Sequence, residues 1–282
     1  MKTLATLLSL LLLVAASAES LAVGISIDAG LTPPEGRWIL RTQVRSMSRT
    51  APAGMGDAEM DRLMVPFVAV HGLRPQLTLG LRQIIDFRTM TMGGDPNETS
   101  GFSDLYFFAK YKVLRINTRS YTLGIAPLLG VEAPTGSSDI SSDFWSLKTG
   151  LLFSGRAGKW GADLNLGYGF RGMAGVPSDS PDPGDEWGVD LALARQFPVG
   201  GSGRTALAPV LEISWQDKAS ATQNGDDVAN TGESVFSLAP GLKYTRGDLI
   251  LEGLVRIPVS QDQTGMQLEM GNMYLVGVRH MF

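Results

Sequence analysis

The chain has 282 residues, including 34 Gly, 15 Pro and no Cys, and its formal net charge is −4 at pH 7. This weakly acidic balance gives no basis for nucleic-acid binding. The absence of cysteine excludes a disulfide scaffold, a thiol nucleophile and thiolate metal ligands. Strand signals fill the chain without a break in composition, which favours one folded domain.

The N-terminus has the features of a secretory signal peptide. Lys2 precedes an apolar run over residues 4–14, and residues 16–18 (ASA) have the small side chains that a signal peptidase reads. The run is too short to span a bilayer, and no later run approaches the ~18 apolar residues of a transmembrane helix. We therefore predict a signal peptide over residues 1–18, a short periplasmic segment over residues 19–35 and a barrel domain over residues 36–282.

Alternation of apolar and polar residues, bounded by turn residues, predicts about 12 strands. Most have the length of about 10 residues or more that a tilted strand needs to cross hydrocarbon. The predicted strands cover residues 36–48, 61–71, 76–89, 103–114, 119–133, 144–154, 160–170, 186–197, 204–215, 234–245, 248–259 and 271–282.

The connections between these strands alternate between short and long. The short ones carry or adjoin Arg and Lys, and the long ones carry most of the acidic residues. In outer-membrane barrels the short turns face the periplasm and the long loops face outside. The predicted long loops are residues 50–60, 90–101, 134–143, 171–185, 216–233 and 260–270.

The two faces of each predicted strand differ in polarity. In the last strand, Tyr274, Val276 and Val278 share one face, Arg279 lies on the other, and the chain ends on Phe282. A soluble sandwich uses the same alternation, but aromatic residues recur here near strand ends, as interfacial girdles do. A terminal Phe resembles the ending by which outer-membrane insertion machinery recognises its clients. We therefore predict Phe282 as an assembly signal and this machinery as a partner.

Four polar side chains fall on the predicted lipid face. His71, Arg195 and His280 lie near periplasmic strand ends, where long or amphipathic side chains reach the interface. Gln83 lies deeper. We therefore expect a β-bulge near residues 84–85 that changes the face there.

The same alternation predicts that basic and acidic side chains in nearly equal numbers face the lumen. These are Arg41, Arg45, Arg82, Arg88, Lys110, Lys112, Lys148, Arg256 and Arg279, with Asp86, Asp104, Glu132, Asp163, Asp190, Glu212 and Glu252. Such charges can form a structural network of ion pairs or line a path for a solute, and both interpretations stay open. Adjacent strands three to six hold the predicted constriction, which is Arg82, Asp86, Asp104, Lys110, Glu132 and Lys148.

Enzyme-like motifs are weak. Residues 167–172 match G-x-G-x-x-G but lie within a strand, with no helix to meet a pyrophosphate. His71 and His280 are the only histidines, so a His-based catalytic or metal site has few parts. The acidic loop 224–227 could bind Ca²⁺, but such loop tips are usually solvated. We predict no catalytic residues, no metal and no cofactor.

Three short motifs carry a family resemblance: residues 101–105 (GFSDL), 109–111 (AKY) and 131–136 (VEAPTG). With them the chain resembles the outer-membrane transporters of the family of the meta-pathway of phenol degradation, and more loosely so over residues 36–282. The resemblance implies a bacterial outer-membrane barrel that takes up small, often aromatic or apolar compounds. It supplies no catalytic residues.

The sequence thus predicts an all-β, transmembrane antiparallel barrel of about 12 strands in the bacterial outer membrane, with lipid and lipopolysaccharide around it. The expected function is passive uptake of a small-molecule solute. A structural or surface-interaction barrel with working acidic loops is the first alternative. An outer-membrane enzyme is the second, which the scarcity of His disfavours.

Overall fold

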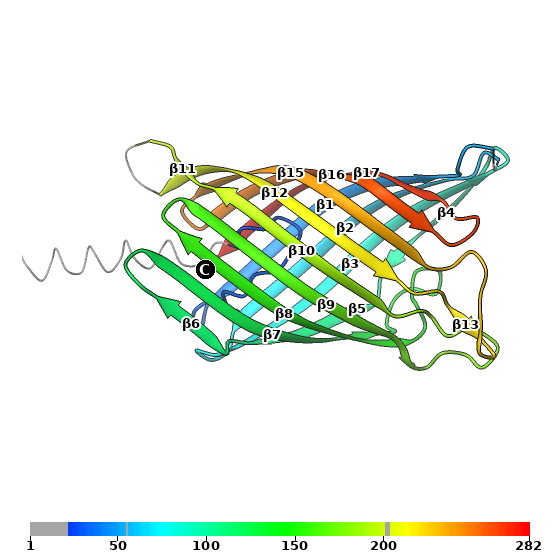
Figure 1. Cartoon of the computed structure of the whole chain (residues 1–282), viewed down its shortest axis with the longest axis horizontal. Coiled ribbons are helices and arrows are strands. Elements are labelled where there is room, and N and C mark those ends of the chain that lie inside the picture. Colours follow the sequence, from blue (N-terminus) through cyan, green and yellow to red (C-terminus); the bar gives the residue numbers. More distant parts are fainter. Residues whose placement is uncertain (1–21, 55, 201–203) are drawn as a thin grey trace, which may run out of the picture.

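The alternating strands close into an antiparallel β-barrel (Figure 1). The computed structural model describes residues 22–54, 56–200 and 204–282, and the predicted signal peptide lies outside this part. The strands are β1 (Trp38–Thr50), β2 (Glu59–Gly72), β3 (Leu77–Met92), β4 (Asp95–Phe102), β5 (Leu105–Tyr111), β6 (Leu114–Asn117), β7 (Tyr121–Ala133), β8 (Trp145–Ala157), β9 (Trp160–Ala174), β10 (Glu186–Arg195), β11 (Phe197–Pro198), β12 (Thr205–Lys218), β13 (Thr222–Gln223), β14 (Asp226–Asp227), β15 (Glu233–Arg246), β16 (Leu249–Gln263) and β17 (Glu269–Met281).

Twelve antiparallel crossings make up the wall, as predicted. Strands β4, β5 and β6 follow one another along one crossing, as do β10 and β11. The first strand, β1, pairs with the last, β17, and Trp38 and Phe282 exchange backbone hydrogen bonds of 2.8 and 3.0 Å at this seam. A closed ladder leaves no strand edge unpaired, which is the condition for strands to cross lipid.

The outer face of the barrel is apolar and the inner face is polar. In β9, Leu166, Tyr168 and Phe170 are exposed outward, whereas Asp163 and Asn165 are buried inside. A soluble domain buries its apolar side chains, so this reversed pattern is that of a surface in contact with lipid. Tryptophans mark strand ends as interfacial girdles do, at Trp38, Trp145, Trp160, Trp187 and Trp215. No helix in the described ranges is long and apolar enough to cross a membrane.

Short turns gather at one end of the barrel, the turn end (left in Figure 1), and long loops at the other, the loop end. Several strands run further toward the loop end than predicted. Residues 90–101, predicted as a loop, extend the β3–β4 hairpin, whose turn is Gly93 and Gly94 with φ of 61° and 93°. Two residues with positive φ fit the tight hairpin turn that matches strand twist. No alternation predicts β4, because its residues 95–101 (DPNETSG) are polar or small on both faces, with Pro96 among them.

The bulge expected near residues 84–85 lies instead on the neighbouring crossing. β3 pairs with β2 in unbroken register, whereas one extra residue separates β4 from β5 around Ser103 and Asp104. The Gln83 amide donates to the Ser103 carbonyl, which this bulge leaves outside the ladder, at 2.6 Å. The polar side chain on the lipid face is therefore satisfied by the backbone beside it.

Residues 22–33, which precede β1, lie inside the barrel, in the half nearer the turn end (Figure 1). We call residues 22–33 the luminal segment. It contains no strand, and most of its residues are buried. This position differs from the periplasmic one predicted for residues 19–35, of which residues 19–21 lie outside the described part. The physical reason is the apolar side chains at every second position, Val23, Ile25 and Ile27. They would be exposed to water in the periplasm, whereas the lumen buries them.

Phe282 offers a test of assembly. We expect its deletion to lower the amount of folded barrel several-fold, because it removes both the aromatic ending and the backbone bonds to Trp38. The heat-modifiable gel shift of membrane fractions measures folded protein. Phe282→Trp keeps both features and should restore the normal level. Normal levels of the truncated chain would contradict the assignment of Phe282 as an assembly signal.

Candidate functional site

Two carboxylates of the wall hold the backbone of the luminal segment. Glu212 on β12 accepts hydrogen bonds from the backbone N–H groups of Ile25 (2.5 Å) and Ser26 (2.9 Å), and from the Ser26 hydroxyl. Asp163 on β9 accepts a 2.7 Å bond from the N–H of Val23. Both carboxylates are almost fully buried. Bonds to a charged acceptor are roughly twice as strong as neutral ones, so these two are the main polar anchors.

Further along, the luminal segment lies directly against β8. The Ser154 hydroxyl accepts a 2.9 Å bond from the Gly30 N–H and donates a 2.5 Å bond to Asp163. A Cβ atom on Gly30 would stand 2.5 Å from the carbonyl oxygen of Leu152. Only glycine allows this approach of backbone to backbone.

Donors from three other strands satisfy the carbonyl groups of the luminal segment. Lys243 on β15 donates to the carbonyls of Ala22 and Val23, Gln43 on β1 to that of Ile25 at 3.1 Å, and Arg279 on β17 to that of Gly24 at 3.3 Å. Buried backbone polar groups without partners are costly, and these contacts remove that cost for an irregular segment.

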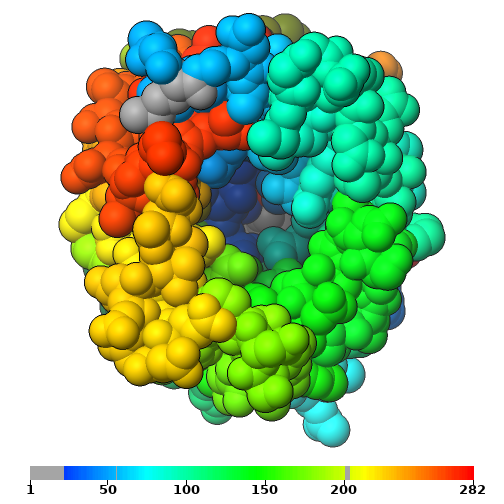
Figure 2. Space-filling model, turned by 90° about the vertical axis from the view of Figure 1, so that its right-hand side faces the viewer, coloured from blue at the N-terminus to red at the C-terminus, as the bar shows by residue number. Residues whose placement is uncertain are grey.

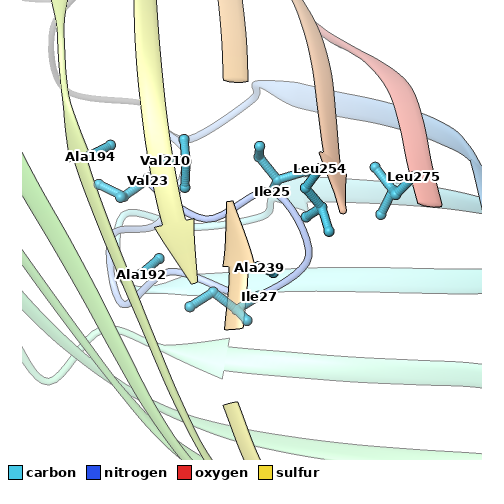
Figure 3. Close-up of a cluster of buried hydrophobic side chains, with 9 residues drawn as sticks. All are labelled: Val23, Ile25, Ile27, Ala192, Ala194, Val210, Ala239, Leu254 and Leu275. Carbon is cyan, nitrogen blue, oxygen red and sulfur yellow. The ribbon is translucent and has the colours of Figure 1, made fainter. Parts of the chain in front are cut away.

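The apolar side chains of the luminal segment pack on one sector of the wall (Figure 3). Val23, Ile25 and Ile27 contribute from the segment. We call the facing sector, from β10, β12, β15, β16 and β17, the apolar wall; it consists of Ala192, Ala194, Val210, Ala239, Leu254 and Leu275. The three alanines there leave room for the segment. Burial of the segment's aliphatic groups stabilises the contact at roughly 1.5–3 kcal/mol per fully buried side chain.

One ion pair joins the luminal segment to the opposite wall. Asp28 lies 3.4 Å from the Lys110 ammonium on β5, and the Asp28 side chain is 52% exposed to the lumen. Desolvation inside the barrel raises the pKa of the Asp28 carboxyl, but Lys110 and Arg41 outweigh it, so the pKa lies below its ordinary value. The carboxylate is therefore ionised at neutral pH.

A second charged network lies toward the loop end. Glu132 is 3.5 Å from Arg82 and 3.4 Å from Lys148, and Lys148 is 3.5 Å from Glu186, which Arg171 approaches to 3.4 Å. We call these five residues the vestibule network. Three of its members, Arg82, Glu132 and Lys148, belong to the predicted constriction.

The other predicted constriction residues lie elsewhere. Lys110 contacts the luminal segment, as above. Asp86 is buried between Arg62 and Arg88, at 2.5 and 2.9 Å. Asp104 accepts hydrogen bonds from the backbone of residues 136 and 142 and from the hydroxyls of residues 141 and 142, so it holds the loop after β7. The prediction grouped these residues because their strands are adjacent. Tilted strands, however, shift neighbouring residues along the barrel axis, so residues on adjacent strands can lie at different depths.

The lumen is open at the loop end and occupied toward the turn end. Figure 2, which faces the loop end, shows a hollow with atoms of the N-terminal part of the described chain at its depth. On the turn side of the luminal segment lies a cavity of about 610 Å³, lined by Ala22, Val23, Tyr121, Trp160 and Lys243 among others. The segment thus separates a wide outer vestibule from this cavity.

Sequence reasoning missed several residues of the site. Asp28, Ser154 and Lys243 are the main ones, and Arg62 and Glu186 also face the lumen. The alternation at residues 23–27 was a usable signal, because three aliphatic side chains in five residues do not suit a solvated linker. No group of three or more His, Cys, Asp or Glu side chains in the described part of the chain could hold a metal ion.

Comparison with known proteins places this geometry among membrane barrels. The sequence pattern of a family described as "Putative MetA-pathway of phenol degradation" matches residues 47–255. No curated protein of similar sequence was found. The β-domain of the Bordetella autotransporter Brka is similar in structure, with a TM-score of 0.53 and 13% identity over 88% of this chain and 100% of that one.

Two further solved structures are similar at lower scores. The transport unit of the autotransporter AIDA-I from Escherichia coli has a TM-score of 0.49 and 10% identity, over 94% of this chain and 97% of that one. The NanC porin has a TM-score of 0.46 and 14% identity, over 85% and 98%. The likeness to the Brka β-domain, at 13% identity and a TM-score of 0.53, shows a shared fold and nothing finer.

Proposed function

The chain belongs to the family described as "Putative MetA-pathway of phenol degradation", and we propose that it is an outer-membrane channel for passive uptake of a small molecule, with the luminal segment as its gate. Two features support this function. The lumen is hollow from the loop end (Figure 2), and what fills the other half is a short irregular segment and not part of the wall.

The single observation that carries the proposal is how the luminal segment is held. It contributes no strand to the ladder, so it can move without opening the wall. Its anchors are separate hydrogen bonds, one ion pair and an apolar contact with the apolar wall. These contacts can break while the ladder of the wall stays intact, so the segment can leave the lumen without global unfolding, which suits a gate.

Partners follow from the same proposal. The small-molecule solute would pass the vestibule network before it meets the luminal segment. Lipid and lipopolysaccharide would surround the apolar outer face. The insertion machinery would act at the β17 end, where Phe282 stands at the barrel seam.

A reversible bridge between the luminal segment and the wall tests the gate. The chain has no cysteine, so Asp28→Cys with Lys110→Cys can be joined specifically by a bismaleimide that contains a cleavable disulfide. In planar bilayers bathed in sodium benzoate, we expect the bridged protein to carry no current, and reductant to restore this influx of benzoate in the same sample. Single-cysteine variants treated with the same reagent are the matched controls.

Equal influx before and after cleavage would show that the luminal segment is not the gate. If neither form admits any solute and planar bilayers stay silent, the structural or surface-interaction alternative replaces the channel.

A further inference from the structure

The luminal segment occupies the part of the lumen that a solute must cross. The wall residues that contact the segment are therefore the ones that a solute would meet there. Resting on the proposed function, we infer that the barrel's solute is a small anion with an apolar body, which binds against the apolar wall and beside Lys110 in place of the luminal segment. Two independent observations carry this inference, one on apolar surface and one on charge.

The apolar wall is unusual for the inside of a membrane barrel, whose lumen is normally polar. It is covered by Val23, Ile25 and Ile27, and Ile25 is fully buried (Figure 3). When the luminal segment leaves, this sector faces water unless something apolar replaces it. A solute with an apolar body restores the lost burial, and a purely polar solute does not.

Charge gives the second half of the description. The carboxylates that anchor the luminal segment also have cations of their own in the wall: Asp163 is 2.8 Å from Arg156, and Glu212 is 3.9 Å from Arg256. They stay paired when the segment leaves.

The lysines differ. Lys110 has its ion pair with Asp28, and Lys243 donates to two carbonyls of the luminal segment. Within the described ranges, neither has a wall carboxylate within ion-pair distance. Departure of the luminal segment therefore leaves two lysine side chains of the lumen without these partners. An anionic solute compensates them, whereas a cation meets repulsion.

A solute that fits must supply both properties at once. A neutral apolar molecule covers the wall but leaves Lys110 without a counter-charge. A small hydrophilic anion pairs with Lys110 but leaves the apolar wall exposed to water. The luminal segment itself combines the two, since Ile27 and Asp28 are adjacent and serve the apolar wall and Lys110 respectively.

Displacement of the luminal segment can be measured without conductance. Ile27 is buried, and the chain has no cysteine, so Ile27→Cys in the full chain reacts with a maleimide when the segment leaves. We expect benzoate to accelerate this labelling at a concentration about ten-fold lower than benzyl alcohol or acetate, as one charge-assisted contact provides. Asp28→Asn removes the competing carboxylate and should lower the benzoate concentration further.

The dependence on the lysines completes the test. In the Ile27→Cys background, Lys110→Met should remove most of the advantage of benzoate over benzyl alcohol, even if basal labelling rises. Arg49→Gln, which alters an ion pair with Glu233 far along the barrel, should leave the advantage intact.

Equal effective concentrations of benzoate and benzyl alcohol would overturn the inference, as would an advantage that survives both Lys110→Met and Lys243→Met. These outcomes are separate from those of the bridge experiment. Influx without preference for benzoate keeps the channel and rejects the solute class. Displacement by benzoate without influx keeps the binding site and rejects uptake.

Discussion

Deletion of residues 22–33 is expected to convert the barrel from a rarely open channel to a continuously conducting pore. The deletion removes the luminal segment but no strand, so the closed ladder and the lipid-facing surface stay intact. Planar-bilayer recordings should show a several-fold larger mean conductance. The pore should also select for anions, because Lys110 and Lys243 lose the partners that the segment supplies.

The matched control for this deletion changes one anchor only. Asp28→Asn keeps the luminal segment but removes its ion pair with Lys110, so we expect brief openings and not steady conduction. The heat-modifiable gel shift confirms folding of both variants. Unchanged conductance after the deletion would place the barrier elsewhere, and the vestibule network around Glu132 would be the next candidate.

Glu252→Leu is expected to destabilise the barrel strongly. The Glu252 side chain is fully buried and accepts hydrogen bonds from Arg41 (2.8 Å), Gln43 (2.7 Å) and Arg279 (2.9 Å). Its loss leaves two guanidinium groups without a carboxylate inside the barrel. Removal of one partner from a buried ion pair costs about 3–5 kcal/mol, and urea unfolding of the reconstituted barrel measures it.

Glu132→Leu is the comparison for that measurement. Glu132 also faces two cations, but at 3.5 and 3.4 Å and with 24% of its side chain exposed. Water screens such pairs, so we expect a loss of at most about 1 kcal/mol. Equal losses in the two variants would mean that burial does not govern the strength of these pairs.

The strands could be predicted because lipid imposes a strict rule on them. Each strand that crosses the membrane must alternate apolar and polar residues over about 10 positions. In β9, Leu166, Tyr168 and Phe170 lie outside and Asp163 lies inside. The rule ends where the lipid ends. Hence the β3–β4 hairpin beyond the membrane was read as a loop, and the bulge at Ser103 was assigned to the wrong strand.

The site was harder to predict because its contacts depend on position along the barrel axis. Alternation correctly predicted that Lys110, Glu132 and Glu212 face the lumen. It carries no information on how far along the barrel axis a residue lies, so Asp86 and Asp104 were grouped with residues that they do not contact. The luminal segment was missed for another reason. Apart from Gln43, which is 18 positions from Ile25, its residues pair with side chains 82 to 255 positions away, and no local pattern reports such partners.

These long separations have a consequence for the timing of biogenesis. The luminal segment leaves the ribosome before the barrel strands, and the wall strands that anchor it, from β1 to β17, are all made later. Contacts between distant parts of a chain form slowly, because the intervening loop must first be closed. Docking of the luminal segment is therefore a late event, at or after closure of β1 against β17. A newly inserted barrel would pass through a leaky interval, so a cell that makes this protein quickly would be transiently more permeable than one that makes it slowly.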